Sequence, residues 1–590
     1  MRFLHRSIAL ASLVLVACSS SSSMPSNDAA MPTGGASGSG GSTVVPLASG
    51  GAARSTALTG GTAGAGGVVA SGGMSASGGA VASGGTVPSG GAVASGGVSA
   101  SSGTRAPGGV VSTGGAATGG VTSGGGSKTG GSASGGSRAG GATGNGGSGT
   151  STSTGTTTGT LTTTATTTVT ATTTETSTVA GAIYVAANGK DTNPGTIEQP
   201  LYSLSVAIGK TSPGSTIYMR GGKYAYNATI AIATSGTAAS PIKLWSYPNE
   251  IPVLDFSTQP YASSNRGILL TGNYWHLKGL EICYAGDNGI KLEGGHNRIE
   301  QCVFHHNGDA GLQLGFAHET ANPNGDLCAY NEIINCDSYL NFDFDNMGSD
   351  ADGFACKMHQ GKGNVFRGCR SWHNGDDGWD LFETDWPVEI TNCWTWHNAD
   401  RADFEAIYQA KMGKKMSSFQ GNGNGFKLGG NGTGGDSKGT HVVKNCVSFD
   451  NNFASKKGFD QNSHKGGVLV QNCTAWGNGY NYMFENDPDA GAKNELDNDV
   501  EFGHKGAMAF EFSAASILNN NSWQLATPAS AADFVALAES LALAPRQADG
   551  GLPANDFARL VATSALVDQG KDVGLPFAGE APDLGAFECK

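Results

Sequence analysis

The chain has 590 residues and a formal net charge of −13, and its 94 glycines are concentrated toward the N-terminus. From Ser19 to Ala180 it consists almost entirely of Gly, Ser, Ala, Thr and Val, which cannot bury enough apolar surface to fold. Residues 181–590 carry 29 Lys and Arg against 46 Asp and Glu, a net charge of −17. This balance argues against nucleic acid as a partner and requires a mediating cation if the substrate is an anion.

The first 18 residues are typical of a secretion signal. Arg2 and Arg6 precede a short apolar run that cannot span a bilayer as a helix. The run ends in Leu15-Val16-Ala17-Cys18 and resembles the lipobox of bacterial lipoproteins, which implies lipidation of Cys18. An ordinary signal peptide with a chance cysteine is the alternative. We expect residues 19–180 to be a disordered linker on a secreted protein. The protein would be lipid-anchored at the outer membrane or cell surface, otherwise extracellular, and would touch the membrane only through this anchor.

Residues 181–590 contain an internal repeat. An apolar, β-rich run followed by Asn, Gln or Gly and then Cys occurs six times, and a phrase of a small or polar residue, Gly and an apolar residue alternates with it. The tightest intervals are 22–25 residues, with short strands and no strong helical period. The pattern predicts an all-β domain, a right-handed parallel β-helix, with a short capping helix within Tyr202–Lys210. We expect it to be a monomer.

The repeated cysteines are Cys302, Cys336, Cys369, Cys393, Cys446 and Cys473. Their shared position after an apolar run favours an inward-facing column of free thiols. Disulfides between stacked coils are the alternative, because secreted proteins often pair their cysteines. Zinc is disfavoured, since no Cys-x-x-Cys pair is present. The asparagines before four of these cysteines are interpreted as turn residues.

Aligning the second phrase brings four aspartates together. Asp352 and Asp377 occupy the same column on neighbouring coils, with Asp376 and Asp380 close by. Carboxylates one or two strand spacings apart repel unless a cation lies among them, and a donor set made only of oxygen favours a hard ion such as Ca²⁺. The alternatives are a hydrated turn or a calcium ion that only joins two coils.

The same alignment puts Lys427 in the column of Asp380, one coil further along. One interpretation is an ion pair with Asp380 or with Asp460, which shares the column. The other is a Brønsted base, because a nearby cation and partial burial both disfavour the ammonium form. The residues alone leave these two open.

Three motifs carry a family resemblance: Ser349-Asp-Ala-Asp352-Gly-Phe-Ala-Cys-Lys357, Asp376-Asp-Gly-Trp-Asp-Leu-Phe382 and Asn424-Gly-Phe-Lys-Leu-Gly-Gly430. They resemble polysaccharide lyase family 9, the pectate lyases and exopolygalacturonate lyases. The resemblance implies that four aspartates hold Ca²⁺ and that one lysine is the catalytic base. These positions match Asp352, Asp376, Asp377, Asp380 and Lys427. It further implies β-elimination of polygalacturonate, in which the base removes the C5 proton and leaves a 4,5-unsaturated end.

Other features concern the substrate. The segment 399–421 is longer than the motif spacing needs, carries Lys411, Lys414 and Lys415, and is expected to form a loop or short helix over the cleft. Candidate substrate contacts, each equally readable as a surface or stacking residue, are Lys357, Arg370, His373, Trp379 and Lys457. Three alternatives remain open: a lyase for alginate or another uronan, a hydrolase with an acid–base carboxylate pair and no calcium, and a calcium-stabilised glycan-binding adhesin.

Overall fold

The structure is a computed structural model, and it describes residues 181–316, 322–430, 439–451 and 455–589. The chain divides into two units, residues 1–157 and 158–590, and all described residues belong to the second. The predicted signal peptide, Cys18 and the linker therefore lie outside the described residues. Within the described part, no helix combines the length and the apolar character needed to cross a membrane.

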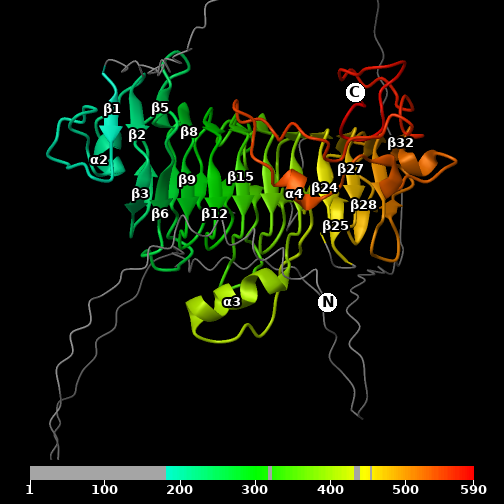
Figure 1. The fold of residues 1–590 in the computed structure, drawn as a ribbon, viewed down its shortest axis with the longest axis horizontal. Coiled ribbons are helices and arrows are strands. Elements are labelled where there is room, and N and C mark those ends of the chain that lie inside the picture. Colours follow the sequence, from blue (N-terminus) through cyan, green and yellow to red (C-terminus); the bar gives the residue numbers. More distant parts are fainter. Residues whose placement is uncertain (1–180, 317–321, 431–438, 452–454, 590) are drawn as a thin grey trace, which may run out of the picture. The chain divides into compact units, whose positions relative to one another are not determined.

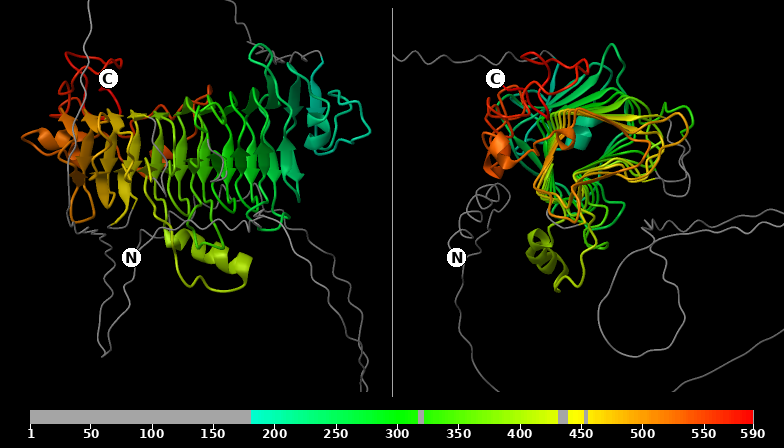
Figure 2. Two further views of the ribbon diagram at one scale, coloured as in Figure 1. Left: turned by 180° about the vertical axis from the view of Figure 1, so that it is seen from behind. Right: turned by 90° about the vertical axis from the view of Figure 1, so that its right-hand side faces the viewer.

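The described unit is a parallel β-helix, as predicted. Three parallel sheets run side by side along its long axis, and each coil adds one strand to each sheet (Figures 1 and 2). Each sheet is in register from coil to coil, so that residues at the same repeat position form straight columns.

Sheet A has 12 strands: β1 (Ile183–Val185), β2 (Thr216–Met219), β5 (Ile242–Ser246), β8 (Trp275–Lys278), β11 (Arg298–Glu300), β14 (Glu332–Ile334), β17 (Asn364–Arg367), β20 (Val388–Thr391), β23 (His441–Lys444), β26 (Val468–Gln471), β29 (Glu495–Asp497) and β32 (Ile517–Asn519). Sheet B has 10 strands: β3 (Gly222–Ala225), β6 (Pro252–Asp255), β9 (Glu281–Cys283), β12 (Val303–His305), β15 (Asp337–Tyr339), β18 (Arg370–Trp372), β21 (Trp394–Trp396), β24 (Val447–Phe449), β27 (Thr474–Trp476) and β30 (Val500–Phe502). Sheet C has 10 strands: β4 (Ile230–Ile232), β7 (Ile268–Leu270), β10 (Ile290–Leu292), β13 (Leu312–Leu314), β16 (Phe354–Cys356), β19 (Trp379–Asp380), β22 (Phe426–Lys427), β25 (Lys457–Asp460), β28 (Tyr480–Phe484) and β31 (Phe510–Phe512).

Alternation within these short strands separates the core from the surface. In strands β16, β19 and β22 of sheet C, the first residue points inward. These three residues are aromatic, and their rings stack on each other from coil to coil. Trp379 lies between Phe354 and Phe426, with ring centroids 5.0 and 4.8 Å away. The residue after each of these points outward, which places Asp380 and Lys427 on the outer face of sheet C.

The cysteine column is confirmed as a buried ladder of free thiols, since all ten cysteines of the described residues are free. The backbone N–H of Cys369 donates to the sulfur of Cys393 at 3.4 Å, and Cys393 and Cys446 repeat the contact toward the next coil at 3.4 Å. The asparagines before four of the cysteines have left-handed backbones, φ between 51° and 54°, and are the turn residues expected (Asn335, Asn392, Asn445 and Asn472).

A second ladder was missed in the sequence, although its signal is there. An asparagine follows every repeated cysteine by five residues, and these side chains form a buried column: Asn307, Asn341, Asn374, Asn398, Asn451 and Asn478. From Asn307 to Asn451, each side-chain amide donates to the side-chain oxygen of the next asparagine, for example Asn341 to Asn374 and Asn451 to Asn478, both at 2.9 Å. The ladder satisfies buried polar groups and fixes the turn that leads into sheet C.

Helices are few. The predicted capping helix is α2 (Leu204–Ile208). Within the predicted insertion lies α3 (Arg401–Met412), which projects from the body in Figure 1. The Asp400 side chain caps its first turn, and Phe404 and Tyr408 pack on Phe342 and Phe344. The C-terminal part contains η2 (Ser522–Gln524), η3 (Ala531–Asp533) and α4 (Glu539–Ala542).

The C-terminal segment covers part of the outer face of sheet B. The side chains of Phe534, Phe557 and Leu560 form one apolar cluster with the outward-facing Trp396 and Trp476. The outer face of sheet C carries charged side chains instead, and the site described next lies there.

Candidate active site

The register of sheet C sets the positions of the predicted site residues. Ala355 pairs with Asp380, Asp380 with Lys427, and Lys427 with Asp460. The predicted column of Asp380, Lys427 and Asp460 is therefore confirmed. Asp352 and Asp377 each lie two residues before paired positions, so they too share a column.

Three of the aspartates converge. Carboxylate oxygens of Asp352, Asp376 and Asp377 all lie within 4.8 Å of one another, and the three side chains are buried. The backbone orients them: the Asp377 N–H donates to Asp352 Oδ1 at 3.2 Å, and the Asn424 N–H donates to Asp377 Oδ1 at 2.7 Å. Oxygen Oδ2 of Asp376 accepts the Asp350 N–H at 2.9 Å.

Asp380 lies beside this cluster, between two lysines. Lys427 Nζ is 3.2 Å from Asp380 Oδ1 and 3.3 Å from Asp377 Oδ2. Lys357 Nζ donates to Asp380 Oδ2 at 3.0 Å and to Asp352 Oδ2 at 2.9 Å. The Lys427 side chain is 12% exposed and the Lys357 side chain 4%. Three of the four carboxylates thus contact the two ammonium groups, and Asp376 accepts backbone N–H groups, so the four carboxylates outnumber these two lysines by two.

This excess of carboxylates appears in the acid–base properties of the site. Burial and the neighbouring Asp376 raise the pKa of Asp377 to about 8, and burial raises the pKa of Asp352 well above its ordinary value. Burial opposes ionisation of Asp380 as well, but Lys427 and Lys357 hold its pKa below the ordinary value. Burial disfavours the Lys427 ammonium, yet Asp380 and Asp377 raise the pKa of Lys427. Without a cation the site therefore holds protons.

The residues fit a calcium ion. The donors are all carboxylate oxygens, which hard cations prefer. Oxygen Oδ2 of Asp377 is buried and accepts no hydrogen bond from the described residues, with Lys427 Nζ 3.3 Å away as its ion-pair contact. A divalent cation also matches the excess of two carboxylates over these two lysines. The metal-ligand role of Asp352, Asp376, Asp377 and Asp380 and the base role of Lys427 remain predictions.

The structure places the other candidate substrate contacts in different environments. Trp379 is fully buried in the core and Arg370 is buried against Asp337, so both are wrong as substrate contacts. His373 binds Asp403 of α3 at 2.6 Å. Lys357 lies in the site and contacts Asp352 and Asp380, a role that the sequence did not indicate. Lys457 pairs with Asp460 at 2.8 Å, next to the site.

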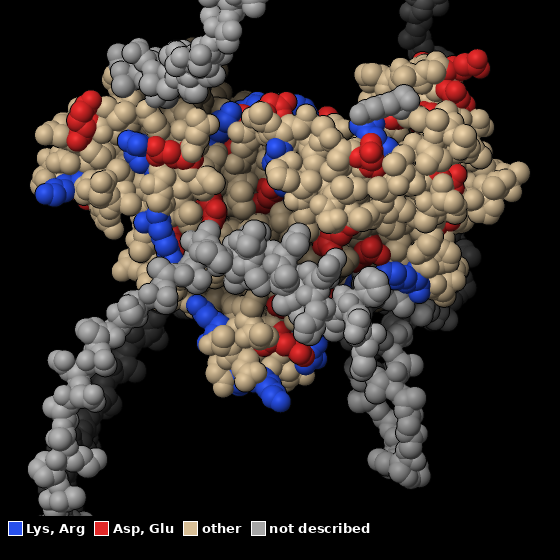
Figure 3. Space-filling model, in the orientation of Figure 1, with Lys and Arg blue, Asp and Glu red and all other residues tan. Residues whose placement is uncertain are grey.

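The insertion contributes backbone to the site. After α3, the chain returns to sheet C, and the Asn422 N–H donates to Asp376 Oδ1. On the face shown in Figure 3, acidic and basic side chains are interspersed, and basic ones mark the projecting part formed around α3. A helix is thus the outcome for segment 399–421. Its effect on the chain length cleaved remains a prediction.

Comparisons with known proteins identify the family. A family model described as "Pel9A-like, right handed beta helix region" matches residues 183–498. The chain therefore belongs to the Pel9A-like right-handed β-helix family, the pectate lyases of polysaccharide lyase family 9. The match includes all four aspartates and Lys427.

Individual relatives agree with this family. Pectate lyase L of Dickeya chrysanthemi is 38% identical over 419 residues, which cover 69% of this chain and 90% of the relative. Pectate lyase L of Paenibacillus polymyxa is 39% identical over 411 residues, covering 67% and 85%. The crystal structure of pectate lyase Pel9A superposes with a TM-score of 0.60 at 37% identity, covering 69% of this chain and 96% of that one.

Proposed function

We propose that this enzyme cleaves polygalacturonate by calcium-dependent β-elimination at the cluster of Asp352, Asp376, Asp377 and Asp380, with Lys427 as the base. The observation that carries the proposal is the charge count of the site: four buried carboxylates, two lysines and a buried carboxylate oxygen without a hydrogen bond. The relatives are pectate lyases, which supports pectate as the substrate.

A bound calcium ion would supply electrostatic stabilisation for the negative charge that develops next to the uronate carboxylate as the C5 proton leaves. The four aspartates would hold the ion. Lys357 would fix Asp352 and Asp380 in place through its two hydrogen bonds, so that the ligand oxygens are oriented before the substrate arrives.

Lys427 would remove the C5 proton. In the free site its ammonium pairs with Asp377 and Asp380. Lys427 would act as the base in its neutral form, because only the free amine can accept the C5 proton. As the proton leaves C5, the bond to O4 breaks, water protonates the departing oxygen, and the new non-reducing end carries a 4,5 double bond.

The test follows the ultraviolet absorbance of that conjugated product. The full chain is incubated with polygalacturonate in calcium, in chelator, and as the variant Lys427→Ala. We expect absorbance that requires calcium and falls on the order of 10³-fold in the variant. Lys444→Ala, which removes a lysine from β23 in sheet A, is the matched control and should retain full activity.

Two results would contradict the proposal. New reducing ends without absorbance would indicate hydrolysis. Calcium-dependent binding of polygalacturonate without any cleavage would favour a glycan-binding protein. Absorbance only with alginate or another uronan would keep the chemistry and replace the substrate.

A further inference from the structure

A second lysine lies in the same outward column as the candidate active site. Lys291, in β10, pairs with Gln313 of β13, which precedes Ala355 and then Asp380 in the column. Its strand neighbours Ile290 and Leu292 point into the core, so Lys291 points outward like Lys427. Three strand steps separate it from Asp380, about 14 Å at the usual spacing.

Lys291 is unusual because it is buried without a counter-ion. The residue is 5% exposed, and within the described part of the chain its ammonium forms no hydrogen bond and no ion pair. Burial lowers the pKa of Lys291 to about 8. A largely buried cation without a direct partner destabilises a fold, and no described residue forms a hydrogen bond or an ion pair with this ammonium.

None of the nearby acidic groups forms an ion pair with Lys291 within the described residues. Asp287 is paired with Arg266, whose Nε lies 2.9 Å from Asp287 Oδ2. Burial and the neighbouring Asp287 raise the pKa of Asp309 well above its ordinary value, which disfavours its charged form. Glu293 acts on Lys291 through space but forms no ion pair with it in the described structure.

We propose that Lys291 binds a carboxylate of the polyuronate chain at a position several sugar residues away from the bond that breaks. The inference rests on the proposed function, because the same anionic chain must lie along the outer face of sheet C. The carboxylate would supply the missing partner of Lys291 as a charge-assisted hydrogen bond. The contact is made only by chains long enough to span the three coils, so Lys291 sets a preference for long substrates.

The experiment compares substrates of different length. Wild type, Lys291→Gln, Lys291→Arg and the control Lys444→Gln are assayed on polygalacturonate and on the shortest oligomer that the enzyme cleaves. For Lys291→Gln we expect KM for the polymer to rise about tenfold with kcat unchanged, and the short oligomer to be cleaved as by wild type. Lys291→Arg should recover most of the polymer affinity.

Thermal unfolding separates this role from a structural one. Because the unpaired ammonium destabilises the free protein, Lys291→Gln should leave Tm unchanged or raise it. A lowered Tm, an equal rise of KM for both substrates, or an unchanged KM for the polymer would overturn the proposal.

If wild type does not cleave polygalacturonate, calorimetric titration with a long oligogalacturonate tests Lys291 by itself. Weaker binding by Lys291→Gln would support the contact even though the proposed reaction had failed. Equal binding by wild type and variant would refute it.

Discussion

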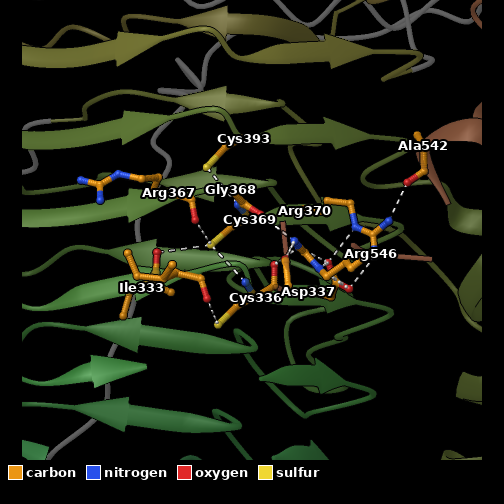
Figure 4. A network of polar contacts seen from close by, with 12 residues as sticks. Ile333, Cys336, Asp337, Arg367, Gly368, Cys369, Arg370, Cys393, Ala542 and Arg546 are labelled. Carbon is orange, nitrogen blue, oxygen red and sulfur yellow. Dashed lines mark hydrogen bonds and ion pairs between the residues drawn. The ribbon is translucent and has the colours of Figure 1, made fainter. Parts of the chain in front are cut away.

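The β-helix contains two buried ionic clusters of opposite design. On sheet B, Asp337 is held by Arg370 and Arg546, with Nη2 of each 2.7 and 2.6 Å from its oxygens (Figure 4). The spare Arg370 nitrogen donates to the carbonyl of Ala542, so this cluster fastens the C-terminal segment to the coils. On sheet C, four aspartates share two lysines, and one carboxylate oxygen receives no hydrogen bond within the described structure.

The pKa values of the carboxyl groups in the two clusters shift in opposite directions. Although burial works against it, Arg546 and Arg370 lower the pKa of Asp337 to about 2, whereas burial and Asp376 raise that of Asp377 to about 8. A cluster with its own counter-ions contributes to the fold. A cluster that lacks them is incomplete until a ligand binds. Lys291 resembles the second cluster, because its ammonium forms no ion pair within the described residues.

The largest expected effect comes from a substitution in the four-aspartate cluster on sheet C. Asp377→Asn should lower activity on the order of 10³-fold, because it removes a carboxylate that the cation and Lys427 both need. Calcium at 100 times its Kd should stabilise the wild type by about 2.7 kcal/mol, and the variant by much less. Thermal unfolding with calcium and with chelator measures this.

Asp450→Asn, on a turn where Asp450 pairs with Lys505, is the control and should behave like wild type. A calcium-dependent rise in Tm that persists undiminished in Asp377→Asn would place the cation elsewhere.

A substitution in the Asp337 cluster, where one carboxylate is paired with two arginines, should lower stability and leave activity unchanged. Asp337→Ala leaves two buried guanidinium groups without a carboxylate, and we expect a loss of about 3–5 kcal/mol in the free energy of unfolding. Urea denaturation measures it. The kcat of the protein that remains folded should match wild type, because Asp337 lies on sheet B, away from the four aspartates. A fall in kcat with stability intact would contradict this assignment.

The sequence predicted the cluster on sheet C better than the cluster on sheet B. The repeat fixes which residues share a column, so the Gly-apolar phrase was enough to bring Asp380 and Lys427 together. Lys357 was a candidate substrate contact, but its contacts with Asp352 and Asp380 were not predicted, because it lies after its strand, where the column argument no longer applies. Its place depends on how the chain bends back toward Asp352.

The contacts of the C-terminal segment had no comparable signal. Arg546 reaches Asp337 from 209 residues away, and the segment that carries it does not repeat. Sequence periodicity therefore predicts the solenoid and its columns, but it does not predict which column a non-repeating segment will cover. The one sequence feature that pointed to the covered face is the column of tryptophans in sheet B. An outward-facing apolar column is normally covered by another segment of the chain.

The smallest expected effect concerns a pH-dependent contact between the insertion and the C-terminal segment. His373 lies between Asp403 of α3 and Glu539 of α4, with nitrogen–oxygen distances of 2.6 and 3.4 Å. Burial opposes its protonation, but the two carboxylates raise the pKa of His373 to about 9. The neighbouring His397 has a lowered pKa and stays neutral over the range concerned.

Since the folded pKa of His373 is above the unfolded value, the stabilisation is complete below about pH 6.5 and is lost as the pH rises through 9. The loss amounts to about 3 kcal/mol at most. Wild type should therefore lose more stability between pH 6.5 and 9.5 than His373→Asn does, in urea denaturation at both values. His296→Asn, at a ring stacked between Tyr274 and Tyr330, is the control and should follow wild type. Equal losses in wild type and His373→Asn would mean that the proton on His373 does not hold α3 and α4 to the coils.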